Sequence, residues 1–154
     1  MRQQFEDGGS GTNFVPLVIE NDLPPTYVMN RVKAHENGGQ CVTFRPQGNK
    51  IATAGSEGTV KLWNPSLNTG ECKTIKVSNG PVSSLAFDNA GTMIAAGDSN
   101  SQINMIRIKP GMEVAFKLQG HQDIINTCVF TSAESGKMIS VSQDRSMRIW
   151  DLNS

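Results

Sequence analysis

Four polar or aromatic residues near the C-terminal end of this chain have side chains that could either catalyse a reaction or form a hydrogen-bond network. They are His121, Ser140, Asp144 and Trp150. A histidine near a carboxylate can act as a base or bind a metal. An indole N–H, however, can only donate, and a hydroxyl can accept that bond while it donates onward. These residue types therefore favour a buried hydrogen-bond network, Asp144–His121–Ser140–Trp150, that stabilises the fold.

The same residue types recur in the N-terminal half of the chain. His35, Thr53, Glu57 and Trp63 follow one another in the same order, and His35 lies 28 positions before Trp63, compared with 29 between the equivalent C-terminal residues. A glutamate is one methylene longer than an aspartate, so we expect this second network to be looser. The recurrence favours a structural over a catalytic role for both histidines.

Short β-like runs separated by polar turns must position these residues. Three of the runs end at Phe44, Phe87 and Phe130, and both intervals are 43 residues. A period of roughly 40–45 residues is typical of the WD40 β-propeller, in which each repeat forms a blade of four antiparallel strands. The runs that end in phenylalanine are expected to be innermost. We predict further strands at 50–54, 59–63 and 71–77, then at 81–87, 92–96, 102–108 and 112–118, and finally at 124–130, 137–142 and 147–152.

The predicted fold class is therefore all-β, with three WD40 β-propeller blades that form a partial propeller. Residues 1–22 are predicted to be a flexible Gly-rich leader, and residues 23–154 the repeat region, with repeats at about 33–74, 75–118 and 119–154. The middle repeat is degenerate, because its four network positions align with Gly80, Ala95, Ser99 and Ile106. We expect this blade to rely on apolar packing.

Two strand edges are expected to lack partners. Residues 27–33 have the composition of an outer strand without a blade of its own, and the third repeat has no fourth strand after residue 152. Three blades are fewer than the four to eight that close a propeller, and unpaired edges are templates for pairing with another chain. Two outcomes follow: head-to-tail self-association of two copies through these strands, or an open arc that aggregates.

Several features resemble one WD40 family in particular. These are LPPTYVMNRVKAHE at residues 23–36, an Ala-His opening of the first repeat, the degenerate middle repeat, and LQGH and SQDRSMRIWDL in the third. They are similar to the first three blades of the C-terminal propeller of the autophagy-related protein 16 family. The resemblance, over residues 23–154, implies a non-catalytic scaffold in autophagosome formation, within the complex that attaches a ubiquitin-like protein to a membrane lipid. The alternative is a WD40 adaptor of another pathway, such as one that recruits substrates to a ubiquitin ligase.

Composition and motifs argue against several other classes. The 14 basic and 14 acidic residues balance, so the chain has no long-range attraction to nucleic acid. It contains no C-x-x-C pair and no common catalytic or nucleotide-binding motif, so we expect no enzyme activity, no cofactor and no metal. The longest apolar run, residues 14–19, is too short to insert across a membrane. Three widely separated cysteines, Cys41, Cys72 and Cys128, favour a reducing compartment and a cytoplasmic location.

A protein-binding surface is the remaining functional hypothesis. The loops that carry the histidines and the turns between the second and third strands lie on one rim of a propeller, and exposed loops on a rigid scaffold often carry recognition. The predicted protein-binding rim comprises Glu36, Asn37, Gln40, Ser56, Gln122, Asp123, Gln143 and Arg145. We expect it to bind other proteins, and the resemblance implies the autophagy conjugation machinery among them.

Overall fold

The computed structural model describes residues 31–64, 71–133 and 135–153, and these residues contain eleven β-strands and no helix. The chain divides into two compact units, residues 1–31 and 32–154, and all of these strands belong to the second. The predicted leader, residues 1–22, lies outside the described residues. The strands are β1 (Gly39–Phe44), β2 (Ile51–Gly55), β3 (Thr59–Trp63), β4 (Cys72–Lys76), β5 (Val82–Phe87), β6 (Met93–Asp98), β7 (Gln102–Arg107), β8 (Glu113–Gln119), β9 (Ile125–Phe130), β10 (Lys137–Ser142) and β11 (Met147–Asp151).

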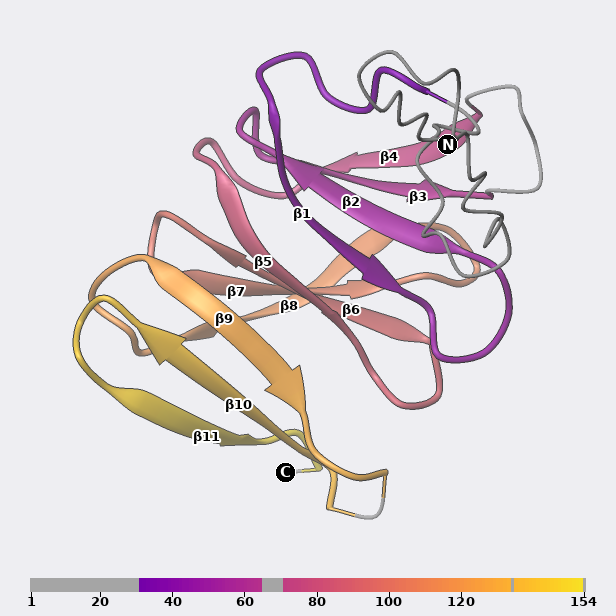
Figure 1. Cartoon of the computed structure of the whole chain (residues 1–154). Coiled ribbons are helices and arrows are strands. Elements are labelled where there is room, and N and C mark those ends of the chain that lie inside the picture. Colours follow the sequence, from indigo (N-terminus) through magenta and orange to yellow (C-terminus); the bar gives the residue numbers. More distant parts are fainter. Residues whose placement is uncertain (1–30, 65–70, 134, 154) are drawn as a thin grey trace, which may run out of the picture. The chain divides into compact units, whose positions relative to one another are not determined.

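These strands form three antiparallel sheets, and each sheet follows the order of the chain (Figure 1). The first blade contains β1 to β4, the second β5 to β8, and the third β9 to β11. The first strands of neighbouring blades contact each other, β1 with β5 and β5 with β9. The predicted all-β class with three blades is confirmed, and the predicted strand bounds differ from the observed ones by one or two residues at most.

Strand alternation places apolar side chains between the blades. In β3, Val60 and Leu62 are buried on one face, as a period of two requires. They join Ile94 of the second blade in one apolar cluster. Met105 of the second blade and Met138 of the third belong to a second cluster, which fills the next interface. Burial of these two apolar layers is the main force that holds the three blades together.

Hydrogen bonds also cross from blade to blade. Arg45 Nε donates to the Gly91 carbonyl at 2.8 Å and links the first blade to the second. Between the second and third blades, the Cys128 N–H donates to Ser84 Oγ at 2.9 Å, and Ser83 Oγ donates to the Ile125 carbonyl. Because these bonds satisfy polar groups at buried interfaces, they fix the register of one blade against the next.

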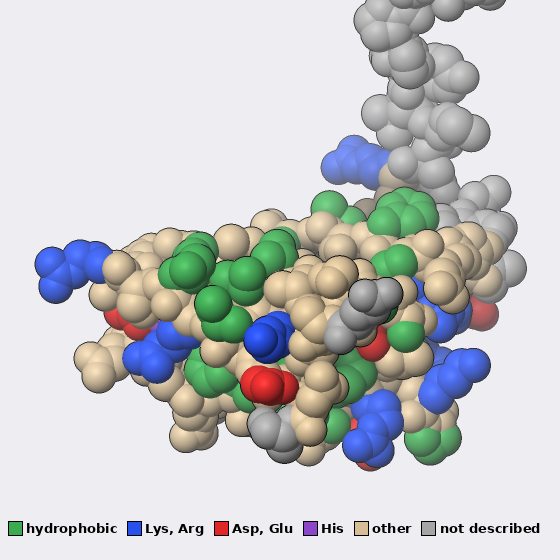
Figure 2. All heavy atoms as spheres, turned by 90° about the horizontal axis from the view of Figure 1, so that it is seen from below, with side chains coloured by type: hydrophobic (Ala, Val, Ile, Leu, Met, Phe, Trp, Pro, Cys, Tyr) green, Lys and Arg blue, Asp and Glu red, His purple; other side chains and the backbone are tan. Residues whose placement is uncertain are grey.

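Two blade faces are not covered by another described sheet. On the first blade, Val42 and Phe44 are 67% and 61% exposed, and on the third blade Met147 and Ile149 are 61% and 62% exposed. Seen from the side of the third blade, hydrophobic side chains lie among polar ones, and Lys and Arg side chains lie mostly toward the margin (Figure 2). These two faces are therefore the apolar surfaces that this stack of blades offers to another surface.

The outer strand predicted at residues 27–33 falls mostly outside the described part of the chain. Residues 27–30 are not described, and residues 31–33 lie in no strand. Within the described residues, β11 pairs only with β10. Strand exchange between two copies therefore stays a prediction. No helix of membrane-spanning length and apolar character occurs among the described residues.

Candidate functional site

His121 lies at the centre of a hydrogen-bonded network in the third blade. Its Nδ1 lies 2.7 Å from Asp144 Oδ2, and its Nε2 lies 2.7 Å from Ser140 Oγ. Trp150 Nε1 donates to the same hydroxyl at 2.8 Å, and the His121 and Trp150 rings meet edge to face. These bonds are all satisfied when the hydroxyl accepts from the indole and donates to Nε2, which leaves the imidazole proton on Nδ1 for the carboxylate.

The Asp144 carboxylate is fixed by further donors from its own turn, between β10 and β11, and from the loop between β8 and β9. Its Oδ1 accepts from the Ser146 hydroxyl at 2.6 Å and from the Ser146 N–H at 2.8 Å, and its Oδ2 accepts from the Gln122 N–H at 3.0 Å. The bond from the Ser146 hydroxyl, assisted by that from His121 and opposed by burial, holds the pKa of Asp144 well below its usual range. Since the His121 side chain is fully buried and both of its nitrogens are bonded, it offers no free base to a substrate.

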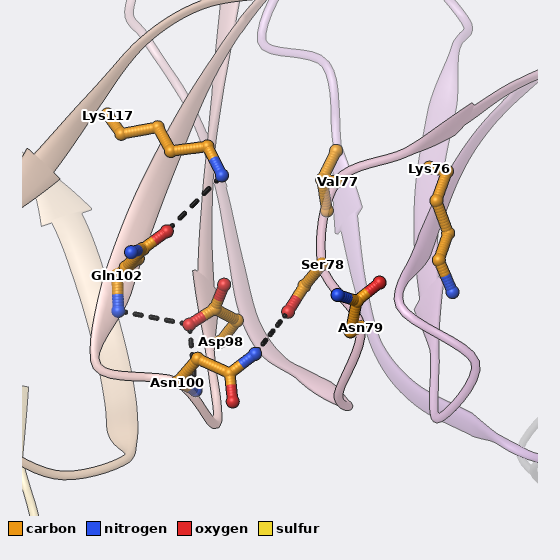
Figure 3. Close-up of a pocket in the computed structure, with 8 residues that line it drawn as sticks. All are labelled: Lys76, Val77, Ser78, Asn79, Asp98, Asn100, Gln102 and Lys117. Carbon is orange, nitrogen blue, oxygen red and sulfur yellow. Dashed lines mark hydrogen bonds between the residues drawn. The ribbon is translucent and has the colours of Figure 1, made fainter.

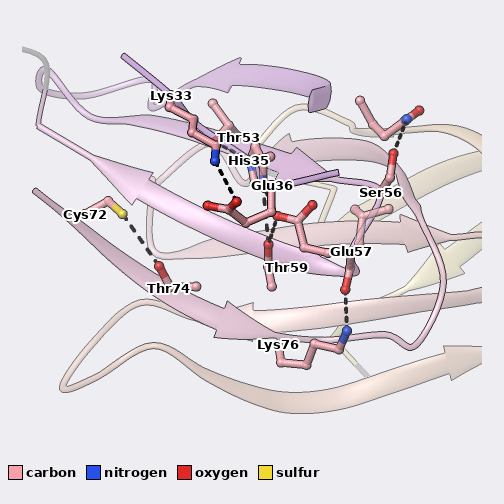
Figure 4. Close-up of polar contacts among 12 residues, drawn as sticks. Lys33, His35, Glu36, Thr53, Ser56, Glu57, Thr59, Cys72, Thr74 and Lys76 are labelled. Carbon is pink, nitrogen blue, oxygen red and sulfur yellow. Dashed lines mark hydrogen bonds and ion pairs between the residues drawn. The ribbon is translucent and has the colours of Figure 1, made fainter. Parts of the chain in front are cut away.

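The first blade contains a matching network. His35 Nδ1 lies 2.5 Å from Glu57 Oε1, His35 Nε2 lies 2.8 Å from Thr53 Oγ1, and Trp63 Nε1 donates to that hydroxyl at 2.8 Å. Thr59 Oγ1 donates to Glu57 Oε1 at 2.6 Å (Figure 4). Burial raises the pKa of Glu57, but the bonds from Thr59 and His35 outweigh burial and hold this pKa at about 2. Glu57 Oε2 is buried without a partner among the described residues, whereas both oxygens of the aspartate in the third blade are bonded.

Strand register identifies the corresponding positions in the second blade. The phenylalanine that ends each inner strand pairs with Ile51 in the first blade, Ile94 in the second and Met138 in the third. The same backbone bond also recurs beside each turn, as from Ser99 N to the Pro81 carbonyl in the second blade. Relative to these reference points, the second-blade residues equivalent to the histidine, hydroxyl residue, acid and tryptophan of the other blades are, in that order, Ser78, Ala96, Asn100 and Ile106.

The predicted alignment of the second repeat is therefore wrong at Gly80, Ala95 and Ser99, and right only at Ile106. The 43-residue period contains the signal that corrects it, because Ser78 and Asn100 lie one period after the histidine and the acid of the first repeat. No histidine, acid or tryptophan occupies any of the four positions in this repeat, so residue type alone does not mark them.

The second blade nevertheless has a polar network of its own. Asn100 Nδ2 donates to Ser78 Oγ at 3.1 Å, at the positions that histidine and acid occupy elsewhere. Asp98, which is 1% exposed, accepts from the backbone N–H of Asn100 at 2.9 Å and of Gln102 at 3.0 Å, and from the Asn104 amide at 3.0 Å. The second blade does pack through apolar side chains, as expected, with Ile94, Met105 and Ile106 fully buried. The buried carboxylate and amide that also organise its turn were not predicted from the sequence.

The predicted rim residues lie at one end of the first and third blades, seven of them on loops and turns and Gln40 at the start of β1. Seven of the eight are exposed, and Ser56, which accepts from Gln40 Nε2 at 2.6 Å, is half-buried. The first-blade group is Glu36, Asn37, Gln40 and Ser56, and the third-blade group is Gln122, Asp123, Gln143 and Arg145. Arg145 has a left-handed φ of 72° in its turn. That this rim binds proteins stays a prediction.

A hollow of about 370 Å³ opens on the same rim, between the first and second blades (Figure 3). The end of β4 and the loop after it form one side, and the turn between β6 and β7 together with β8 forms the other. The lining residues are Lys76, Val77, Ser78, Asn79, Asp98, Asn100, Gln102 and Lys117. None of them was predicted from the sequence as a site residue, and the 43-residue period would have marked only Ser78 and Asn100 among them as network positions.

Other reactive groups are few in the described part of the chain. No group of three or more His, Cys, Asp or Glu side chains there could hold a metal ion. Cys41, Cys72 and Cys128 are free thiols. Burial raises the pKa of Cys41 to about 11 and also raises that of Cys128. Because the thiolate is the nucleophile, these two thiols are poor nucleophiles at neutral pH.

Several characterised proteins are similar to this chain in sequence. Autophagy-related protein 16 of Arabidopsis thaliana is 26% identical over 135 residues, which cover 88% of this chain and 26% of the relative. Nuclear distribution protein nudF of Aspergillus niger is 28% identical over 131 residues, 84% of this chain and 29% of the relative. DENN domain and WD repeat-containing protein SCD1 of Arabidopsis thaliana is 27% identical, over 86% of this chain and 11% of the relative. The chain thus spans less than a third of each of these relatives.

Solved structures share the fold. The WD40 repeats of RRP9 superpose with a TM-score of 0.70 at 20% identity, over 79% of this chain and 37% of that chain. The WD40 β-propeller domain of Doa1 superposes with a TM-score of 0.67 at 22% identity, over 79% of this chain and 40% of that chain. The repeat family described as WD domain, G-beta repeat matches residues 27–64, 70–106 and 112–151. Each match covers, to within one residue, the first three strands of one blade, and the second and third matches begin with the outer strand of the preceding blade. The chain therefore belongs to the WD40 repeat family.

Proposed function

We propose that this chain is a non-catalytic WD40 scaffold for protein partners in autophagosome formation, as part of a complex that attaches a ubiquitin-like protein to a lipid. A role as a protein-interaction scaffold follows from the WD40 family itself. The assignment to autophagy is carried by one observation, the similarity to Arabidopsis Autophagy-related protein 16 across 88% of the chain. A cytoplasmic location is part of the proposal, and three free thiols support it.

The non-catalytic part of the proposal is supported by the two histidine networks. Each imidazole is fully buried and has both nitrogens bonded to neighbours in its own blade. General acid–base catalysis requires a titratable group within hydrogen-bond reach of a substrate. Neither His35 nor His121 meets that requirement in the folded blade, so binding at the rim is the activity that the geometry favours.

The assignment to autophagy, rather than to another WD40 pathway such as substrate recruitment to a ubiquitin ligase, needs a direct test. Curated relatives of similar identity include nuclear distribution proteins and a DENN-domain protein. The tagged chain should be expressed in cells in which autophagy is induced, and its co-purification with the lipid-conjugation enzymes quantified. Recovery of those enzymes supports the proposal, and recovery of ubiquitin-ligase subunits instead contradicts it.

A matched pair of variants tests whether the rim carries this binding. Gln122 and Gln143 are exposed on the rim, whereas Gln47 is exposed in the turn between β1 and β2, at the opposite end of the blades. Replacement of both rim glutamines by alanine should lower the recovery of the conjugation enzymes. Gln47→Ala should leave recovery unchanged. Equal recovery with all variants would show that this group on the rim does not carry the interaction.

A further inference from the structure

The hollow between the first and second blades is flanked by two lysines whose charges are not neutralised by a neighbour. The Lys76 ammonium donates to the backbone carbonyl of Glu57, and the Lys117 ammonium donates to Gln102 Oε1 at 3.2 Å. Both acceptors are uncharged, and among the described residues neither lysine forms an ion pair. Since an ammonium has three N–H donors, each lysine retains donors for an acceptor from outside.

The one carboxylate among the residues that line the hollow is already hydrogen-bonded within the second blade. Asp98 is buried, and three donors from Asn100, Gln102 and Asn104 bind its two oxygens. Figure 3 shows Asp98 between Asn100 and Gln102, where it holds the turn in place. A buried carboxylate with these partners stabilises the floor of the hollow, so the lysines remain available to another anionic group.

Ser78 adds a donor that the protein itself does not use. Its side chain is 8% exposed, and its hydroxyl oxygen accepts from the Gly80 N–H at 3.2 Å and from Asn100 Nδ2 at 3.1 Å. The hydroxyl proton has no acceptor among the described residues. The neighbouring Asn79 and Asn100 side chains carry amides, which offer both donors and acceptors and thus match the peptide group.

We propose that this hollow binds an acidic segment of a protein partner. The two lysines lie on opposite sides of the hollow, so they bind different carboxylates of the acidic segment, while the Ser78 hydroxyl and the asparagine amides bond to the peptide groups between them (Figure 3). The volume, about 370 Å³, lies within the range of about 300–1,000 Å³ that is usual for ligand sites. No aromatic side chain lines the hollow, so it offers no stacking platform for nucleic-acid bases. The inference rests on the proposed role as a protein scaffold and specifies the chemistry of the partner.

The test is an NMR titration of the purified chain with an acetylated, amidated peptide of sequence Gly-Asp-Glu-Asp-Gly. The matched probe is Gly-Asn-Gln-Asn-Gly, which keeps the amides and removes the charges. We expect the acidic peptide to shift the backbone amides of Ser78, Asn79, Asn100 and Gln102, and the neutral peptide to shift none of them. Because the lysines act as exposed point charges, added salt should weaken binding.

Charge variants locate the interaction. Lys76→Gln combined with Lys117→Gln should weaken binding about fivefold or more, a loss of roughly 1 kcal/mol, as expected for two partly screened charge pairs. Lys137→Gln removes an exposed lysine from the third blade and should leave affinity nearly unchanged. The amide spectrum of each variant reports whether it remains folded, so a loss of folding is recognised separately from a loss of binding.

Several results would overturn the inference. They are no shift at the lining residues, equal shifts with the neutral peptide, or unchanged affinity of the double lysine variant. Inorganic phosphate that reproduces the shifts and competes fully with the peptide would identify a free-anion site instead. The titration uses purified protein, so its failure is distinct from that of the cellular experiment. Peptide binding without recovery of the conjugation enzymes would support this binding site and contradict the assignment to autophagy.

Discussion

Replacement of Ser140 by alanine is expected to destabilise the third blade through the two groups that its hydroxyl serves. Ser140 is 1% exposed, and its Oγ lies 2.8 Å from Trp150 Nε1 and 2.7 Å from His121 Nε2. Its loss strands an indole donor and an imidazole nitrogen. Each stranded buried group costs about 1–3 kcal/mol. Because Trp150 is half-buried and water recovers part of its loss, we expect the free energy of unfolding to fall by about 2–4 kcal/mol.

The measurement is urea unfolding followed by circular dichroism, arranged as a double-mutant cycle. Trp150→Phe removes the indole donor and keeps an aromatic ring. Ser140→Ala should therefore cost about 1–2 kcal/mol less in the Trp150→Phe background than in the parent chain. Ser99→Ala is the control, since the Ser99 hydroxyl forms no hydrogen bond among the described residues, and it should change stability by about 0.5 kcal/mol or less.

Equal costs of Ser140→Ala in the two backgrounds would refute the assigned bond between the indole and the hydroxyl. A cost for Ser99→Ala as large as that for Ser140→Ala would refute the wider reasoning. That result would mean that loss of any serine hydroxyl in these turns, bonded or not, destabilises the protein, and the network would then have no special role in the stability of the blade.

Three further predictions concern titration, thiol reactivity and assembly. The pKa of Glu57 falls from an ordinary 4.5 to about 2 on folding, so its contribution to stability is present above about pH 4.5 and is lost as the pH falls toward 2. Glu57→Gln should flatten the stability profile from urea melts across this window, and an unchanged slope contradicts the assignment. Burial raises the pKa of Cys41 to about 11 and also raises that of Cys128, so at neutral pH both thiols should react with a thiol reagent far more slowly in the folded chain than in the urea-unfolded chain. Equal rates would contradict this. Ile149 is exposed and occupies in β11 the register position that buried Leu62 occupies in β3, so Ile149→Lys should reduce any self-association of the chain measured by light scattering. A parent chain that is monomeric at every concentration would rule this assembly out.

The residues of the two histidine networks could be predicted from sequence because each residue type supplies the hydrogen-bond donor or acceptor that its neighbour in the network needs. A buried indole needs an acceptor, a hydroxyl can accept and donate, and an imidazole links that hydroxyl to a carboxylate. In the third blade the structure brings His121, Ser140, Asp144 and Trp150 within hydrogen-bond distance in that order. The strands were predictable for a related reason, since the repeat period and the alternation of apolar residues depend on backbone geometry.

The buried polar network of the second blade was not predictable from the same signals. Asp98 aligns in strand register with Gly55 of the first blade and Ser142 of the third, and neither position carries an acid. Asn104 aligns with Lys61 of the first blade. A comparison of repeats therefore gives no reason to pair Asp98 with Asn104. Their contact follows from the cross-strand geometry of β6 and β7, which is defined only once the register is known.

The three blades link the same turn to the same loop through different side chains. In the first and third blades an imidazole spans from the loop to the acid of the turn. In the second blade Ser78 and Asn100 make that link directly, and a hydroxymethyl group fills less space than an imidazole. The network there is incompletely satisfied, because Asn104 Oδ1 is buried without a partner among the described residues. Asp98 nevertheless keeps this turn ordered, and Ser78 and Asn100 line a polar hollow that a partner's side chain can enter.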